Sequence, residues 1–124
     1  MDRKKELKEL YKQMKPPMGV YVIRSNFSKK CFLEATNNLK GRLNSTKVKL
    51  ENNFHPNREL QKDWNEHGEG SFTFEILEEL EYAKDDSKTD YSDDLALLHM
   101  EWEEKMAAAG YEFYNKSFGA RKHD

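Results

Sequence analysis

The N-terminal residues 2–14 have a helical pattern of hydrophobic and polar positions. Apolar side chains recur three or four positions apart between lysines and glutamates, which predicts an amphipathic helix. These apolar residues are Leu7, Leu10, Tyr11 and Met14. Pro16 and Pro17 disfavour helix and favour extended chain, so we expect the helix to end before them.

Three later segments have the pattern of β-strands. Residues 19–25 and 31–36 are rich in β-branched and aromatic side chains, and the polar stretch 26–30 separates them. This arrangement predicts a hairpin. Residues 71–80 alternate Phe72 and Phe74 with polar neighbours, which is typical of a half-buried strand.

Helical patterns follow the hairpin and the third strand. Asn37 or Asn38 can cap a helix over residues 39–50. The segment 55–68 predicts a second helix, with Pro56 in its first turn.

A last helix is expected after a charged loop that begins near residue 81. It opens at Asp90 or Ser92 and ends at Gly110, and its apolar line includes Leu98 and Trp102. Residues 111–115 would follow as a packed tail or a short strand. The order of elements predicts an α+β fold, a three-stranded antiparallel sheet flanked by helices, with the N-terminal helix as an addition.

The composition agrees with one small domain and limits its setting. The chain has 124 residues, of which 36% are hydrophobic and 35% charged, and its 12% of aromatic residues argues against disorder. The lone Cys31 excludes an internal disulfide, so a reducing, cytoplasmic compartment is expected. No apolar run is long enough to suggest a membrane span, and we expect a monomer without membrane contact.

Positive charge gathers in one part of a chain whose net charge is −2. Most acidic residues follow Glu66, whereas the predicted helix 39–50 is basic. Its cations are Lys40, Arg42, Lys47 and Lys49. We expect this segment to contact the phosphates of DNA or RNA, although a solvated helix face would show the same pattern.

Six short segments, in this order, resemble the GIY-YIG nuclease family. The resemblance extends from about Gly19 to Asn115. The segments are "GVY" at 19–21, "FLE" at 32–34 in the place of YIG, "NNLKGR" at 37–42, "FTFEILEEL" at 72–80, "LLHMEW" at 97–102 and "YEFYN" at 111–115. With this resemblance, we expect the domain to comprise residues 19–115. Residues 1–18 would form a helix and a Pro-Pro linker packed on the domain, and residues 116–124 a flexible tail.

The resemblance also implies metal-dependent hydrolysis of phosphodiesters with one divalent ion, usually Mg²⁺. In that scheme Glu101 holds the metal, and Tyr21 helps to activate the attacking water. Arg42 stabilises charge on the phosphate, and Asn115 is the closing asparagine of the motif. A cation and a guanidinium suit a reaction in which negative charge develops on a phosphate.

Two residues of the second motif depart from the family pattern. Phe32 stands where the family has a tyrosine and has no hydroxyl, so it can neither donate nor take a proton. Glu34 stands where the family has a glycine. Its carboxylate would either repel a phosphate from the site, remain on the surface, or serve as an additional metal ligand.

From the residues alone, simpler interpretations remain open. Tyr21 has the pattern of a core aromatic residue, and Glu101 is one of three neighbouring glutamates on a helix. The four histidines show no zinc-ligand spacing, and we interpret them as structural or exposed. Three functions therefore stand beside one another: an active nuclease, a weakened or inactive member that binds nucleic acid or protein, and a protein-interaction domain.

Overall fold

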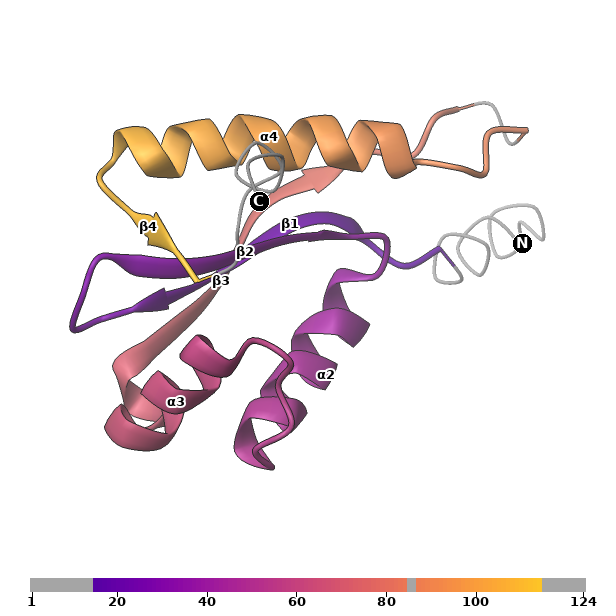
Figure 1. Ribbon diagram of the computed structural model, residues 1–124. Coiled ribbons are helices and arrows are strands. Elements are labelled where there is room, and N and C mark those ends of the chain that lie inside the picture. Colours follow the sequence, from indigo (N-terminus) through magenta and orange to yellow (C-terminus); the bar gives the residue numbers. More distant parts are fainter. Residues whose placement is uncertain (1–14, 85–86, 115–124) are drawn as a thin grey trace, which may run out of the picture.

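A computed structural model describes residues 15–84 and 87–114. It forms a four-stranded sheet between two helical layers (Figure 1). The predicted helix over 2–14, the predicted tail 116–124 and Asn115 lie outside the described residues. The elements, in chain order, are β1 (Met18–Ser25), β2 (Lys30–Thr36), α2 (Leu39–Glu51), α3 (Arg58–His67), a 3₁₀ turn (Glu69–Ser71), β3 (Phe72–Leu80), α4 (Ser92–Ala108) and β4 (Glu112–Phe113).

The sheet has the order β3-β1-β2-β4, with β1 antiparallel to both β2 and β3. The predicted three-stranded antiparallel sheet is therefore incomplete, because β4 adds a parallel strand beside β2. The backbone N–H of Glu112 donates to Lys29 O at 2.7 Å, and that of Tyr114 donates to Cys31 O at 2.8 Å. A two-residue strand has no periodicity of its own, so the sequence pattern could not distinguish it from a packed tail.

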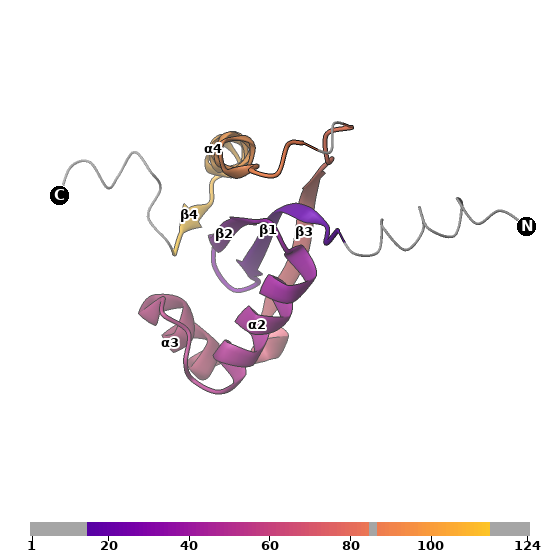
Figure 2. The same cartoon turned by 90° about the vertical axis from the view of Figure 1, so that its right-hand side faces the viewer.

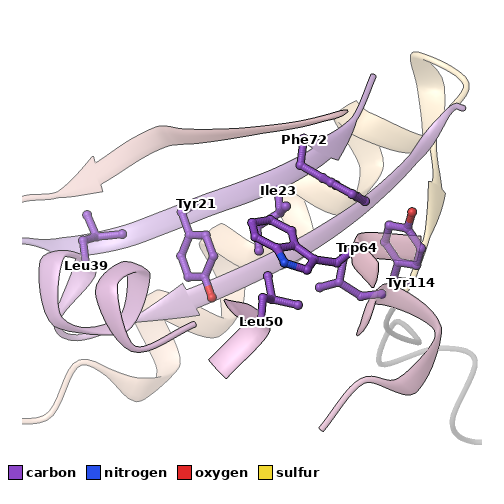
Figure 3. Close-up of a cluster of buried hydrophobic side chains, with 8 residues drawn as sticks. Tyr21, Ile23, Leu39, Leu50, Trp64, Phe72 and Tyr114 are labelled. Carbon is purple, nitrogen blue, oxygen red and sulfur yellow. The ribbon is translucent and has the colours of Figure 1, made fainter. Parts of the chain in front are cut away.

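The two faces of the sheet are covered by different helices. Figures 1 and 2 show α4 on one face and α2 with α3 on the other. Val20 and Val22 of β1 pack toward α4, whereas Tyr21 and Ile23 pack with α2 and α3. Because both faces are covered, β1 is apolar at almost every position and does not alternate as a half-exposed strand would. Figure 3 shows the core cluster on the α2 and α3 side.

Asparagine side chains begin the two helices that follow the hairpin. Asn38 caps α2, because its side chain accepts from the backbone N–H of Gly41 at 3.1 Å. Asn57 caps α3 in the same way, accepting from Leu60 N–H at 3.0 Å. The second helix therefore begins at Arg58, and the prediction of Pro56 in its first turn is wrong. In the described part of the chain, no helix is long and apolar enough to cross a membrane.

Gly19 allows β3 to lie close against β1. A Cβ atom at this position would lie 2.0 Å from the carbonyl oxygen of Glu78, which is backbone and cannot rotate away. The pairing of β1 with β3 also shifts register between Val20 and Tyr21, next to this glycine. The first residue of the "GVY" segment is thus required by the sheet itself.

We expect Gly19→Ala to lower the free energy of unfolding by about 1–3 kcal/mol, because the added methyl group must displace backbone atoms of β3. Urea denaturation measures this change. Gly70→Ala is the matched control, since a Cβ there meets nothing within 4 Å. Equal stability of the two variants would contradict the close-approach argument.

Candidate active-site groove

A groove of about 960 Å³ lies along the part of β2 that β4 does not pair. The strand contributes Phe32, Glu34 and its neighbours, and Arg42 enters from the first turns of α2. Helix α4 closes the other side with Leu95 and His99. The groove therefore lies along the free edge of β2, between α2 on one face of the sheet and α4 on the other.

The carboxylate of Glu34 joins the hairpin to α2. Tyr21 and Glu34 are partners in the β1–β2 register, and the Tyr21 hydroxyl donates to Oε1 of Glu34. The same hydroxyl lies 3.1 Å from the Oγ1 of Thr46 on α2. Oε2 of Glu34 lies 3.2 Å from Nε of Arg42. Both oxygens of one carboxylate are thus engaged by residues that the sequence placed in the candidate site.

Tyr21 is a neutral hydrogen-bond donor in this arrangement. Its side chain is fully buried at 0% exposure. Burial, followed by the negative charge of Glu34, raises the pKa of Tyr21 far above its ordinary value. The hydroxyl therefore remains protonated at neutral pH and cannot take a proton from water as a phenolate.

Arg42 faces the groove from an exposed position. Its side chain is 45% exposed, whereas that of Glu34 is 26% exposed. The ion pair neutralises the positive charge that a phosphate would meet there. Glu34 has an ordinary backbone conformation within a regular ladder, so a glycine is not required at this position by the strand.

His55 extends the site on the α2 and α3 side. Its ring lies edge to face with Phe32, with 5.1 Å between the ring centroids. Its Nδ1 accepts from the backbone N–H of Asn57 at 3.0 Å, and burial lowers the pKa of His55. The charge of Glu34 also acts on this ring. No sequence spacing indicated this proximity, because the connection between α2 and α3 creates it.

Helix α4 presents His99 to the groove, while Glu101 is exposed and does not line it. The Nε2 of His99 lies 3.2 Å from the carbonyl oxygen of Leu33 and can donate to it. The Nδ1 of His99 lies 3.8 Å from Glu103, a glutamate whose pKa burial raises. The metal-binding role of Glu101 stays a prediction to which this geometry lends no support. A signal for His99 existed in its spacing of four from Leu95, which puts both on one helix face.

The predicted nucleic-acid contacts are spread over α2. Lys40 and Lys47 are exposed and Lys49 is half-buried. In the described residues, the groove lining includes Arg42 and none of these three lysines. Asn115 lies outside the described residues, so its place in the site stays a prediction.

The described residues of the groove do not form a metal-binding site in their present arrangement. Mg²⁺ is usually held by one or two carboxylates together with water and substrate oxygens. Glu34 is in the right place, but Arg42 and Tyr21 already engage its oxygens. In the described ranges, the three-residue cluster with metal-ligand spacing is Asp63, Glu66 and His67 on α3, outside the groove lining.

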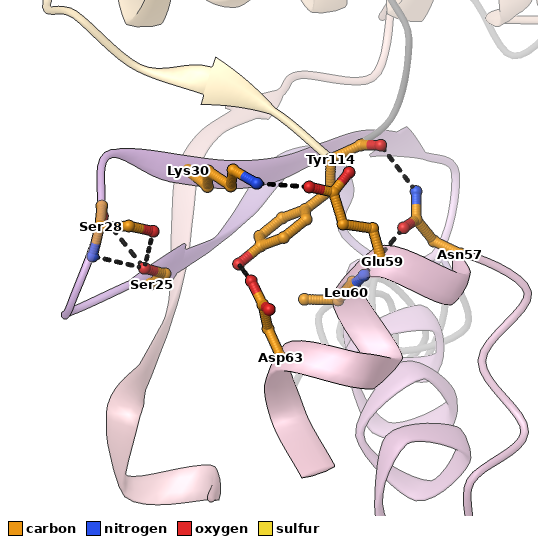
Figure 4. A network of polar contacts seen from close by, with 8 residues as sticks. All are labelled: Ser25, Ser28, Lys30, Asn57, Glu59, Leu60, Asp63 and Tyr114. Carbon is orange, nitrogen blue, oxygen red and sulfur yellow. Dashed lines mark hydrogen bonds and ion pairs between the residues drawn. The ribbon is translucent and has the colours of Figure 1, made fainter. Parts of the chain in front are cut away.

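A second polar network fixes the C-terminal end of the domain to α3 (Figure 4). The Tyr114 hydroxyl donates to Asp63 at 2.6 Å, and the Asn57 side-chain amide donates to Tyr114 O at 3.0 Å. Lys30 of β2 pairs with Glu59 of α3 beside them. The network holds the chain immediately before Asn115 against α3.

Two solved structures match this α+β fold. The catalytic domain of the homing endonuclease I-TevI is 21% identical, with a TM-score of 0.61, over 80% of this chain and 99% of that one. A mutant of the catalytic domain of the intron endonuclease I-TevI is 23% identical, with a TM-score of 0.59, over 77% of this chain and 92% of that one. No protein-family model and no curated protein matches the chain. The chain therefore has a GIY-YIG-like fold, as its motifs suggested.

We expect Tyr21→Phe to lower the free energy of unfolding by about 1–3 kcal/mol, because Glu34 loses a buried donor to a charged group. Thermal and urea unfolding measure the change. Tyr111→Phe is the control, since its hydroxyl forms no hydrogen bond within the described residues. A loss of less than about 0.5 kcal/mol in Tyr21→Phe would show that the hydroxyl does not support the network.

Stability is expected to fall as pH decreases below the ordinary pKa of histidine, about 6.5. The lowered pKa of His55 means that the unfolded chain binds a proton in this window while the folded protein does not. Stability should therefore be fully present above this window and be lost as pH falls toward the folded pKa. Urea midpoints at about pH 7.5 and pH 5.5 test the sign, and His55→Gln should reduce the difference. An unchanged difference in that variant would assign the pH dependence to other groups.

Proposed function

We propose that this domain binds the phosphate backbone of DNA or RNA and that Glu34 suppresses metal-dependent hydrolysis in its groove. The observation that carries the proposal is the shared carboxylate of Glu34, which bonds the Tyr21 hydroxyl and pairs with Arg42. The GIY-YIG-like fold supports nuclease ancestry, and the intact Arg42 supports phosphate binding. The native protein is therefore expected to cleave weakly. Its single cysteine agrees with a cytoplasmic setting.

The suppression follows from competition for the same guanidinium. Arginine pairs with carboxylate and phosphate through similar oxygen geometry, so a phosphate must displace Glu34 to reach Arg42. A displaced carboxylate would then lie near the phosphate. Two like charges about 4 Å apart repel by about 4 kcal/mol at an effective dielectric constant of about 20.

The remaining residues can bind and orient a phosphate better than they can move protons. Tyr21 donates one hydrogen bond and stays neutral, and Phe32 offers no hydroxyl. Arg42 supplies positive charge where negative charge develops. A divalent ion, when bound, would polarise the phosphoryl oxygens and lower the pKa of a bound water.

Glu34→Gly tests the proposal directly. Removing the carboxylate frees Arg42, and we expect cleavage with Mg²⁺ or Mn²⁺ to rise at least about tenfold, the equivalent of about 1.4 kcal/mol in the barrier. The assay uses single-stranded, duplex and branched DNA and RNA. Glu34→Gln should give a smaller rise, because the amide keeps the bulk of the side chain without its charge.

The opposite result would identify Glu34 as a metal ligand. In that case the native protein would cleave well, and both Glu34 variants would lose activity together with metal affinity. Arg42→Ala in the Glu34→Gly background is the control, because any gained activity that depends on phosphate binding must vanish with it.

A second candidate function is a binding module without hydrolysis. The observation that favours it is His99 at the groove, on the helix whose Glu101 is exposed. Nucleic-acid binding by the native protein, with no cleavage in Glu34→Gly, would select this candidate. Absence of binding to any nucleic acid at low salt would reject both.

A further inference from the structure

We infer that Phe54, in the connection between α2 and α3, is a stacking platform for an unpaired base of single-stranded DNA or RNA. The inference rests on the proposed nucleic-acid binding and adds a second contact outside the groove. Among the large apolar side chains of the described residues, Phe54 is the most exposed, at 74%. Phe54 belongs neither to the core cluster on the α2 and α3 side nor to the lining of the groove.

The backbone around Phe54 is held in place, so its exposure belongs to an ordered loop. The Phe54 N–H donates to Lys49 O at 2.7 Å, after Asn53 has turned the chain with a φ of 64°. Gln61 accepts from the N–H of His55 at 2.9 Å and donates to Leu50 O at 2.9 Å. An aromatic ring presented by a preorganised loop loses little conformational entropy when a ligand stacks on it.

A further contact to this loop comes from the side-chain amide of Asn65 on α3. It donates to the side-chain oxygen of Asn53 at 3.0 Å. The loop is therefore attached to α2 through its backbone and to α3 through side chains. A single exposed apolar side chain is common on protein surfaces, so the fixed loop and the cations around the ring are what distinguish Phe54.

Positive charge around Phe54 complements a nucleic-acid backbone. A hollow of about 680 Å³ beside the ring is lined by Arg58 and Lys62, which lie one helical turn apart on α3, and by Glu66. Lys49 approaches from the end of α2, near enough to His55 to act on its titration. Within the described residues, Arg58, Lys62 and Lys49 form no ion pair, unlike Arg24, Lys30 and Arg42.

The position of Phe54 connects this surface to the groove. His55, the next residue, packs against Phe32 of the groove lining. A strand that places a phosphate at Arg42 can therefore continue past His55 toward Phe54. Aromatic stacking accepts any base, because every base has a π-face, and it needs that base to be unpaired. A duplex hides its bases from such a ring.

The loop that contains Phe54 lies on the face of the sheet opposite α4 (Figure 2). The other strongly exposed apolar residue, Leu97 at 61%, lies on α4 among acidic neighbours. Leu97 is therefore a control: it is also strongly exposed, but its acidic surroundings would not attract a phosphate.

The first experiment measures binding of a short fluorescein-labelled single strand by anisotropy at low salt. Phe54→Ala should weaken binding about tenfold, Phe54→Tyr should preserve it, and Leu97→Ala should leave it unchanged. A duplex of the same sequence should compete poorly and be insensitive to Phe54→Ala. Native affinity in Phe54→Ala would overturn the inference while leaving the proposed function intact.

The second experiment uses Phe54→Trp, whose introduced indole reports on stacking through its own fluorescence. The single strand should quench this emission in proportion to binding, beyond the change seen in the native protein. Quenching by duplex alone would overturn the inference. So would a blue shift with vesicles of phosphatidylcholine and phosphatidylserine without any response to the oligonucleotide, since it would assign the ring to a membrane surface. Failure of the native protein to bind any oligonucleotide would instead refute the proposed function itself.

Discussion

The central strand β1 is the constraint on which the rest of this structure depends. It is paired along both edges, by β2 and β3, and covered on both faces, by α4 and by α2 with α3. Such a strand must be apolar throughout, and its neighbours must approach closely. Gly19 permits that approach where β3 pairs with the start of the strand. The helices take their places because each covers one face of this strand.

The burial of β1 also determines the chemistry of the groove. A tyrosine hydroxyl buried within such a strand must find a partner, since an unsatisfied buried hydroxyl is costly. Tyr21 finds the carboxylate of Glu34 directly across the hairpin, and that carboxylate in turn attracts Arg42. The three side chains satisfy one another. To act on a bound phosphate, the donors of Tyr21 and Arg42 would have to point toward a substrate oxygen. In this structure they bond Glu34 instead, which agrees with the proposal of binding without efficient hydrolysis.

The site thus lies at the edge of the sheet, where residues of both helical layers reach β2. The hairpin and α2 supply the charged network, the α2–α3 connection supplies His55 beside Phe32, and α4 supplies His99 at the opposite wall. The groove and the exposed ring of Phe54 adjoin through His55, which packs against Phe32 of the groove lining. A ligand that follows this path would be an extended strand with both charge and unpaired bases, which is the chemistry of single-stranded nucleic acid.

The sequence by itself predicted the order and type of the longer elements from β1 to α4, limited the cap of α2 to Asn37 or Asn38, and contained the ordered motifs of a GIY-YIG-like fold. These features are local, because strand and helix periods and capping side chains act within a few residues. Only the tertiary structure decided that Glu34 joins Tyr21 to Arg42, that His99 and not Glu101 reaches the groove, and that β4 completes the sheet. Strand register and the rotation of α4 about its axis set these contacts, and one residue along a helix turns a side chain by about 100°. The sequence cannot distinguish the three neighbouring glutamates on α4, which are Glu101, Glu103 and Glu104. Only the packing of α4 on the sheet determines which face of the helix each one occupies.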